Sequence, residues 1–287
     1  MSMASIDFLN TAQAAYWNGA GGRRWADHLD RHEALFRPIS DRLIDVADAR
    51  PGEFVLDIGC GSGATTIEFA ARVAPEGEAL GVDVSETLLR HARERAPEDV
   101  PARFIHADAT LYEAPPGEID LVASRFGVMF FADPTRSFAN LRAGMKPGGR
   151  LAFACWRAAR ENPWMIVPLR AAAGHAPPLP ELGPEDPGPF AFADENRVRR
   201  ILFDAGFLDV DVEPEDYQLD IALGGGLDAA VDAALSLGPA SRMLEDQPEP
   251  ARAAAAAAIR DAFARHADGD RVPLGAAVWF VTARNPD

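Results

Sequence analysis

A regular alternation of short apolar runs and helical patterns between residues 52 and 155 constrains the fold of this sequence more than any other feature. The apolar runs lie at residues 54–58, 79–83, 103–106, 119–123 and 150–154, and the helical patterns at 64–73, 86–96 and 134–143. Strands that alternate with helices in this way form repeated β-α-β units, which build a parallel sheet with helices on both faces. Because such crossovers are right-handed, the sequence predicts a doubly wound α/β fold.

The rest of the chain divides into segments of different composition. The predicted boundaries are an N-terminal helical lid (1–50), a cofactor-binding α/β core (51–156), a proline-rich insert (157–193), a core helix and strand (194–221), a helical insert (222–272) and a last core strand (273–287). The core helix has Asp194 as its expected N-cap and Gly206 as its C-cap. We expect the two inserts to form a mostly helical cap over the core.

Composition excludes several classes of protein. The chain has 287 residues, a formal net charge of −16 and two cysteines, Cys60 and Cys155. An acidic chain has no general positive field for a phosphate backbone or an anionic membrane surface, so neither a nucleic acid nor a membrane is an expected partner. Two cysteines are too few for a disulfide framework or a cysteine-rich zinc site, and no cluster has the spacing of metal ligands. Without a long apolar run or a signal-peptide pattern, a cytoplasmic protein is expected.

A glycine-rich segment, Asp57 to Gly63, lies where the first predicted strand meets the first predicted helix. Glycine lets the backbone approach a ligand closely there, and the amides of the helix N-terminus face an anionic group. The segment also fits the dinucleotide pattern G-x-G-x-x-G/A, and Asp83 lies about 20 residues further on. A nicotinamide dinucleotide and S-adenosylmethionine both need a carboxylate at that place for a ribose diol. The glycine pattern alone therefore leaves both ligands open.

The acidic residues around the glycines favour S-adenosylmethionine over a nicotinamide dinucleotide. Asp57, directly before the first glycine, would crowd a pyrophosphate but can attract the ammonium of a methionyl group. Asp108, after the third strand, can accept a hydrogen bond from an adenine amino group, and Lys146 to Arg150 make a tight turn into the fifth strand. At these residues the sequence resembles the class I S-adenosylmethionine-dependent methyltransferases. It looks closest to the small-molecule branch that includes the ubiquinone/menaquinone-biosynthesis-like and type-11 enzymes.

The resemblance spans about residues 45–155 and, more weakly, 194–213 and 276–283. It implies a Rossmann-like seven-stranded sheet with an antiparallel last strand, S-adenosylmethionine as cofactor and S-adenosylhomocysteine as product. The residues that it implies for the cofactor are Asp57, Gly59, Gly61, Gly63, Asp83, Val84, Asp108, Ala109, Ser124 and Arg125, with Phe126 alongside. In the relatives an N-terminal helical segment folds over the cofactor, which implies contacts from Tyr16, Trp17 or Trp25. Packing of the tryptophan rings onto the sheet is the alternative.

No residue stands out as a general base. Methyl transfer is an in-line displacement at an activated carbon, so a base is needed only if the acceptor starts protonated. His106 is expected as a packed or hydrogen-bonded residue in a strand. His28 and His32, one helical turn apart, could form a site over the cofactor, but a solvated helix face is favoured. The role of His175 is open.

The sequence therefore predicts a methyltransferase that acts on O, N or C of a small, partly apolar metabolite. Arg125 and Arg157 could pair with an acidic acceptor, but pairing with nearby acids such as Glu161 is favoured. Two other readings stay open. One is a non-catalytic S-adenosylmethionine-binding sensor or scaffold. The other is an NAD-dependent oxidoreductase, although Lys146 is the sole lysine and no Tyr-x-x-x-Lys pair exists. Both a monomer and a homodimer fit the sequence.

Overall fold

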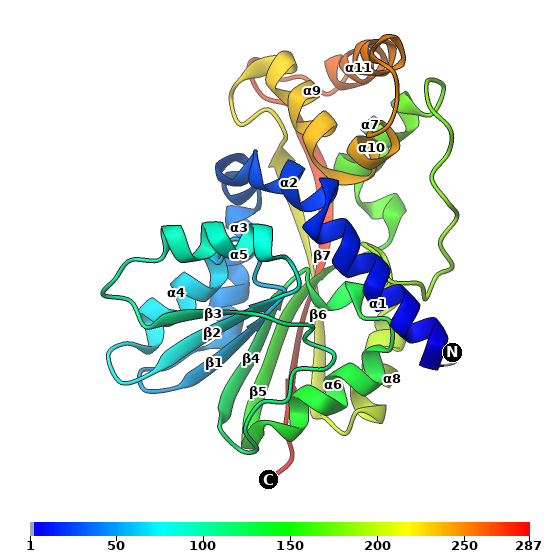
Figure 1. Cartoon of the computed structure of the whole chain (residues 1–287). Coiled ribbons are helices and arrows are strands. Elements are labelled where there is room, and N and C mark those ends of the chain that lie inside the picture. Colours follow the sequence, from blue (N-terminus) through cyan, green and yellow to red (C-terminus); the bar gives the residue numbers. More distant parts are fainter. Residues whose placement is uncertain (1–2) are drawn as a thin grey trace.

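A seven-stranded sheet organises the computed structural model, which describes residues 3–287 and the side chains from residue 11 onward. The strands are β1 (Phe54–Ile58), β2 (Glu78–Asp83), β3 (Ala102–His106), β4 (Ile119–Arg125), β5 (Met145–Trp156), β6 (Leu208–Asp220) and β7 (Pro273–Arg284). Their order is β3-β2-β1-β4-β5-β7-β6 (Figure 1). Strands β1 to β5 run parallel, and β7 is antiparallel to both of its neighbours. The predicted doubly wound sheet with an antiparallel last strand is confirmed.

Five helices flank this sheet: α3 (Leu29–Ala47), α4 (Ala64–Val73), α5 (Glu86–Arg95), α6 (Pro134–Ala143) and α8 (Glu195–Asp204). The crossover from β1 to β2 runs the opposite way along the sheet from the crossover between β4 and β5, so right-handed connections place α4 and α6 on opposite faces. Ser85 caps α5, and Asp194 caps α8 as predicted. These caps fix where each helix begins at the carboxyl edge of the sheet.

A helical layer lies over the carboxyl ends of the strands (Figure 1). Its helices are α7 (Pro163–Ala172), α9 (Gly226–Ser236), α10 (Gly238–Met243) and α11 (Glu249–Ala264). Helix α7 packs against α10 and α11, and α9 packs against α11. Residues 173–193 contain no helix or strand, as the proline content predicts for the second half of that insert.

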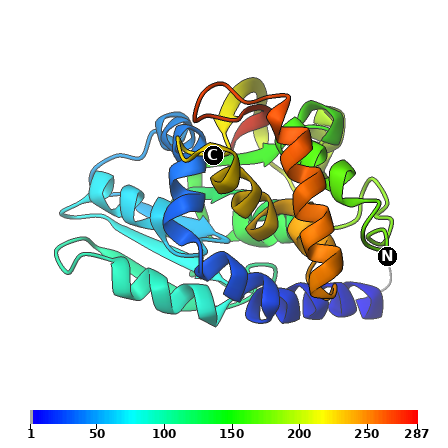
Figure 2. The same ribbon diagram turned by 90° about the horizontal axis from the view of Figure 1, so that it is seen from above.

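The N-terminal segment forms α1 (Met3–Asn18) and α2 (Ala20–Ala26), which run along one side of the molecule in the view from above (Figure 2). The glycine-rich stretch between Trp17 and Trp25 predicts a turn, but Gly21 and Gly22 lie inside α2. A Cβ on Gly21 would approach the Tyr16 ring to 2.4 Å. These glycines therefore let α2 fold back closely onto the end of α1. None of the helices within residues 3–287 is both long and apolar enough to cross a membrane.

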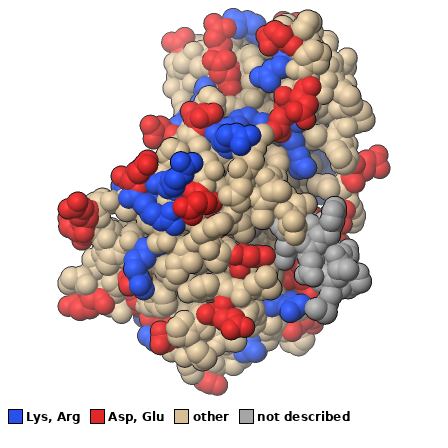
Figure 3. Space-filling model, in the orientation of Figure 1, with Lys and Arg blue, Asp and Glu red and all other residues tan. Residues whose placement is uncertain are grey.

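The alternating residues from Leu208 to Val212 predict a short strand, but β6 continues to Asp220 because it pairs with β7 that far. Charged side chains of both signs are interspersed over the face shown in Figure 3. The apolar core lies between the sheet and its helices. Its largest fully buried side chains are Phe36, Phe69, Phe138, Phe153, Phe192, Phe207, Phe263 and Phe280.

Candidate functional site

A cavity of about 460 Å³ lies at the carboxyl ends of β1, β2 and β4, where the direction of the crossovers reverses. Doubly wound sheets bind their ligands at this position. Three parts of the chain supply the walls: the loops that follow the strands, the N-terminal helices, and the helical layer above. The cavity has a polar portion next to the strand ends and an apolar portion beneath the helices.

The glycine-rich loop forms the floor of the polar portion. Gly59 and Gly61 line the cavity and have φ angles of 66° and 53°, a region that favours glycine. A Cβ on Gly59 would lie 2.7 Å from the Gly127 Cα, so the loop tolerates no side chain there. Gly63 begins α4 and is not part of the cavity lining.

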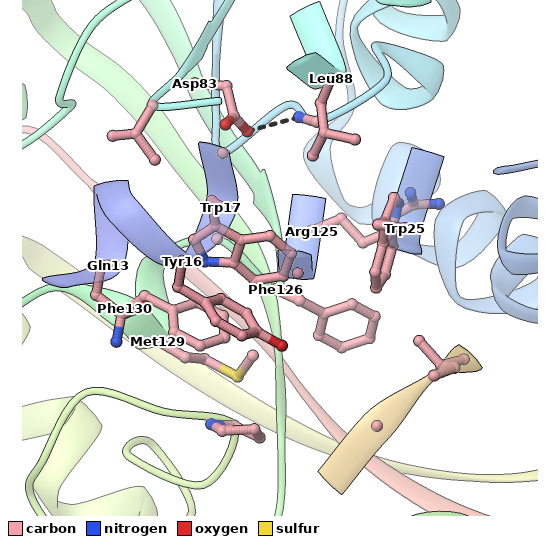
Figure 4. A pocket seen from close by; sticks show the side chains of 18 of the residues that line it. Gln13, Tyr16, Trp17, Trp25, Asp83, Leu88, Arg125, Phe126, Met129 and Phe130 are labelled. Carbon is pink, nitrogen blue, oxygen red and sulfur yellow. Dashed lines mark hydrogen bonds between the residues drawn. The ribbon is translucent and has the colours of Figure 1, made fainter. Parts of the chain in front are cut away.

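Asp83 fastens this loop to the end of β2. Its Oδ2 accepts a hydrogen bond from the Gly61 N–H at 2.8 Å, and its Oδ1 accepts one from the Ser85 N–H at 2.8 Å. Burial raises the pKa of Asp83, while these backbone amides act to lower it. The carboxylate lines the cavity (Figure 4), and Ser85, rather than Asp83, is the N-cap of α5.

The next part of the wall follows β2 and β3. Val84, Asp108 and Ala109 all line the cavity. Asp108 Oδ1 accepts a hydrogen bond from the Thr110 N–H at 2.8 Å, which fixes the loop. The His106 Nε2 lies 2.9 Å from the Val84 carbonyl oxygen, so the prediction of a hydrogen-bonded histidine is confirmed.

A buried ion pair closes the other end of the polar portion. Arg125 Nη1 and Nη2 donate to the two carboxylate oxygens of Glu33 at 2.7 and 2.8 Å, and the Ser62 hydroxyl donates to the same carboxylate at 3.3 Å. Arg125 and Glu33 both line the cavity. Burial acts to raise the pKa of Glu33, but the Arg125 guanidinium lowers it below its ordinary value.

Sequence reasoning missed Glu33, although a signal was present. Glu33 follows Leu29 by four residues and precedes Phe36 by three, so it lies in the apolar stripe of α3. A charged residue within such a stripe is seldom buried unless it is paired.

Two predicted residues lie behind the wall of the cavity. The buried Asp57 Oδ2 accepts hydrogen bonds from the Thr65 and Thr66 hydroxyls, both at 2.7 Å. Its Oδ1 has no partner among the described residues, and burial raises the pKa of Asp57 to about 6. The Ser124 hydroxyl donates to the Ile58 carbonyl oxygen at 2.8 Å. Neither side chain is part of the lining, and both hold strand ends in place.

Aromatic rings dominate the apolar portion. Trp17 packs edge-on against Phe130 with the ring centroids 5.7 Å apart, and Trp25 lies 6.1 Å from Trp17 (Figure 4). Phe126 has a φ of 65°, rare for a residue with a side chain, and its ring stacks on Trp156 at 4.1 Å. The further apolar lining residues include Tyr16, Phe36, Met129, Phe131, Trp164, Met165, Leu169, Leu179, Phe190 and Leu237.

The histidines do not supply a base to this cavity, because none of them belongs to its lining in the described part of the chain. The prediction of a solvated face is wrong for His32, which is 1% exposed and packs against Trp25 at 4.5 Å between ring centroids. Burial, together with the nearby His28, lowers the pKa of His32 to about 4. His32 is therefore a neutral core residue.

Arg157 also takes the structural role that the sequence favours. Its guanidinium pairs with Glu161 and with Asp216, and it lies over the Trp279 ring at 4.9 Å. Among residues 3–287 there is no group of three or more His, Cys, Asp or Glu side chains that could hold a metal ion.

The N-terminal helices are tied to the polar portion by three hydrogen bonds. The Asn18 amide donates to the Val84 carbonyl oxygen at 2.6 Å and accepts from the Glu86 N–H at 3.0 Å. The Ser85 hydroxyl donates to the Trp17 carbonyl oxygen at 2.7 Å. The segment that carries Trp17 thus lies on the same loop that presents Asp83.

Comparisons with known proteins agree with this geometry. A profile described as "Methyltransferase domain" matches residues 55–149. Nocamycin O-methyltransferase from Saccharothrix syringae is 32% identical over 266 residues, which are 87% of this chain and 91% of that protein. A ubiquinone/menaquinone biosynthesis C-methyltransferase from Ectopseudomonas mendocina is 33% identical over 111 residues, or 38% of this chain and 43% of the relative.

A solved structure shares the fold over the whole chain. Haemonchus contortus phosphoethanolamine N-methyltransferase 2 in complex with S-adenosyl-L-methionine superimposes with a TM-score of 0.58 at 17% identity. The match covers 100% of this chain and 61% of the other.

Proposed function

Because this chain belongs to the S-adenosylmethionine-dependent methyltransferases, we propose that it methylates an oxygen atom of an apolar acceptor that is already ionised when it binds. The chain is an enzyme that transfers a methyl group from S-adenosylmethionine to a small molecule. The observation that carries the proposal is the composition of the apolar portion of the cavity, whose described residues form aromatic walls and include no acid–base pair.

The residues present fit S-adenosylmethionine. The side-chain-free cradle at Gly59 and Gly61 admits a ligand against the backbone, and the Asp83 carboxylate is available for a ribose diol. Asp108 and Ala109 would meet the adenine edge, with Val84 beside it. When bound, this cofactor supplies a methyl group activated by a sulfonium.

We assign the methionyl end to the buried ion pair. The Arg125 guanidinium suits a carboxylate and the Glu33 carboxylate suits an ammonium, so the pair matches the two charges of an amino-acid group. Asp57, Gly63 and Ser124 would act indirectly, because they shape the strand ends and the loop from behind. Trp17 and Trp25 would cover the cofactor from the N-terminal side.

Within the described lining, the titratable groups other than arginine are Cys60, Glu33, Asp83 and Asp108 in the polar portion and Tyr16 in the apolar portion. Burial raises the pKa of Cys60 well above its usual range, so its thiol is a poor base. The Tyr16 hydroxyl accepts a hydrogen bond from Arg24 at 3.1 Å, so one of its lone pairs is already used. An acceptor that is ionised in water, such as a carboxylate or an acidic phenol, needs no base.

The comparisons favour oxygen over carbon as the methylated atom. The relative that matches along most of its length is an O-methyltransferase, and its match includes the region of the cap. The C-methyltransferase matches over 38% of this chain. The protein's part in the reaction is alignment of the two reactants and exclusion of water by the aromatic walls.

Product analysis tests the proposal with pairs of acceptors that share a ring system. Naphthoic acids and acidic naphthols are compared with naphthylmethanols, and the products are identified by mass and NMR. We expect methyl esters or ethers from the ionised compounds only, at a rate that does not rise with pH once the acceptor is ionised. Methylation at carbon, or turnover of the alcohols through a titrating base, would contradict it. Binding without turnover of any acceptor would favour a sensor.

Substitution Asp83→Asn tests the assignment of the cofactor. Hydrogen bonds to a charged group contribute about 1.5–3 kcal/mol, so the Kd for S-adenosylmethionine should rise about tenfold or more in calorimetry. The melting temperature should fall as well, because Asp83 also holds the Gly61 and Ser85 amides. Asp99→Asn, an exposed residue outside the cavity, is the control. Unchanged affinity would show that the ribose binds elsewhere.

A further inference from the structure

Three arginines line the cavity, and they differ in their partners. At the polar end, both terminal nitrogens of Arg125 donate to the Glu33 carboxylate. Arg24 of α2 pairs with Glu245 at 3.4 Å. Arg242 of α10 has no carboxylate partner among the described residues, and its guanidinium lies over the Tyr16 ring at 5.0 Å from the centroid.

Arg24 and Arg242 meet around the same ring. Arg24 donates to the Tyr16 hydroxyl at 3.1 Å, while Arg242 covers the face of that ring. Because Arg242 is exposed and lines the cavity, Arg24, Tyr16 and Arg242 lie at the solvent-facing end of the apolar portion. A guanidinium carries five N–H donors and recognises planar oxyanions better than any other side chain.

The hydroxyl groups nearby do not compete for this role. Ser241 donates to the Gly238 carbonyl oxygen at 2.8 Å, and Ser236 donates to the Ala233 carbonyl oxygen at 3.0 Å. Both protons are therefore used within the helices. Among the described residues that line this end of the cavity, Arg242 is the cationic side chain without a carboxylate partner.

We infer that the acceptor carries an anionic substituent remote from the methylated oxygen, and that Arg242, flanked by Arg24 and Tyr16, binds it at the mouth of the cavity. The acceptor is thus an amphipathic molecule with a ring system for the aromatic walls and an oxyanion such as a carboxylate, sulfonate or phosphate at one end. This inference rests on the proposed function, because it assigns the apolar portion to the acceptor.

Two fluorescent probes with the same rings test the inference on protein saturated with S-adenosylhomocysteine. Anilinonaphthalene sulfonate carries an anion, and N-phenylnaphthylamine does not. We expect one molecule of either probe per chain, with the sulfonate bound more tightly. Arg242→Gln should weaken the sulfonate about five- to tenfold and leave the neutral probe within about twofold. Added salt should weaken sulfonate binding in the wild type more than in the variant.

Arg265→Gln is the matched control, because Arg265 is exposed at the end of α11 and lies outside the lining. It makes the same charge change and should alter neither affinity. Equal effects of Arg242→Gln on both probes, or none on either, would overturn the inference while the apolar cavity stands. Failure of the wild type to bind either probe would instead overturn the proposed use of the cavity, and the inference with it.

Discussion

Two adjacent ionisable residues on α3 have opposite electrostatic surroundings. His32 packs against Trp25 and stays neutral, whereas Glu33 pairs with Arg125 and stays charged. Removal of one partner of a buried ion pair leaves the other charge uncompensated, which is more costly than the loss of the same pair at a surface. Because a buried charge is costly, we infer that the Glu33 carboxylate serves to bind the amino-acid end of the cofactor.

Glu33→Gln tests this relation. The variant keeps a hydrogen-bond acceptor for Arg125 but loses the charge that would bind an ammonium. The Kd for S-adenosylhomocysteine should rise about tenfold, and the Kd for methylthioadenosine, which lacks the amino-acid group, should change less than about twofold. Calorimetry measures both, and Glu68→Gln on the surface of α4 is the control. An equal loss of affinity for the two ligands would mean that Glu33 has a structural role and does not bind the amino-acid group.

His32→Leu tests the neutral state of that histidine. The pKa of His32 is about 4 in the folded protein against an ordinary 6.5, so between these values the unfolded chain binds the proton more strongly. The stability that neutral His32 contributes is present above pH 6.5 and is lost as the pH falls towards 4. By linkage, the leucine variant should lose about 2 kcal/mol less unfolding free energy than the wild type between pH 7.5 and pH 5.

Urea unfolding at the two pH values measures this difference. His266→Leu, in which an exposed histidine is replaced, should keep the acid sensitivity of the wild type. An equal loss of stability in the wild type and in His32→Leu would mean that His32 is protonated in the folded protein.

The secondary structure elements of the core follow from local sequence, and those of the cap do so less fully. Helix α4 has the predicted bounds, and β1 and β2 differ from prediction by at most one residue, because central strands are buried on both faces and read as apolar runs. The extension of β6 depends on pairing with β7, which lies about 50 residues further along the chain. Because that partner is distant in sequence, the local pattern of apolar residues does not predict the extension of β6.

The residues of the site also divide into those that local sequence predicts and those that depend on distant contacts. The glycines and the acids at strand ends are readable because motif spacing fixes their place on the fold. Arg242 in α10 and Phe190 in the irregular segment 173–193 line the cavity, and nothing in their local sequence indicates it. Phe126, which has a positive φ, likewise stacks on a ring distant in sequence, that of Trp156.

At the scale of elements, Asn18 links the N-terminal helices to the loop between β2 and α5. Asn18→Ala removes both of its bonds to that loop, so α1 and α2 should exchange amide hydrogens faster. Since these helices carry Trp17 and Trp25, the affinity for S-adenosylmethionine should also fall about three- to tenfold. Asn196→Ala, exposed on α8, is the control. Faster exchange with unchanged affinity would mean that the lid does not contribute to cofactor binding.

For the whole molecule, the net charge of −16 predicts a salt-dependent stability. Self-repulsion destabilises a highly charged compact state, and salt screens it. The melting temperature at pH 7.5 should therefore rise by about 2–5 °C between about 10 and 300 mM NaCl. The rise should vanish near pH 5, close to the sequence pI of 4.8. A fall with salt at pH 7.5 would show that attraction between surface ion pairs outweighs the repulsion.

The segment that carries α9, α10 and α11 begins and ends at neighbouring positions of the backbone. Asp220 pairs with Pro273 in the ladder of β6 and β7, and the Ile221 N–H donates to the Val272 carbonyl oxygen at 3.0 Å. In topological terms the whole segment is therefore the loop of one hairpin, and a different loop could close the same two strands. We expect that a transplant of this segment from a relative changes which acceptor binds, without disturbing the glycine loop or the acids at the strand ends.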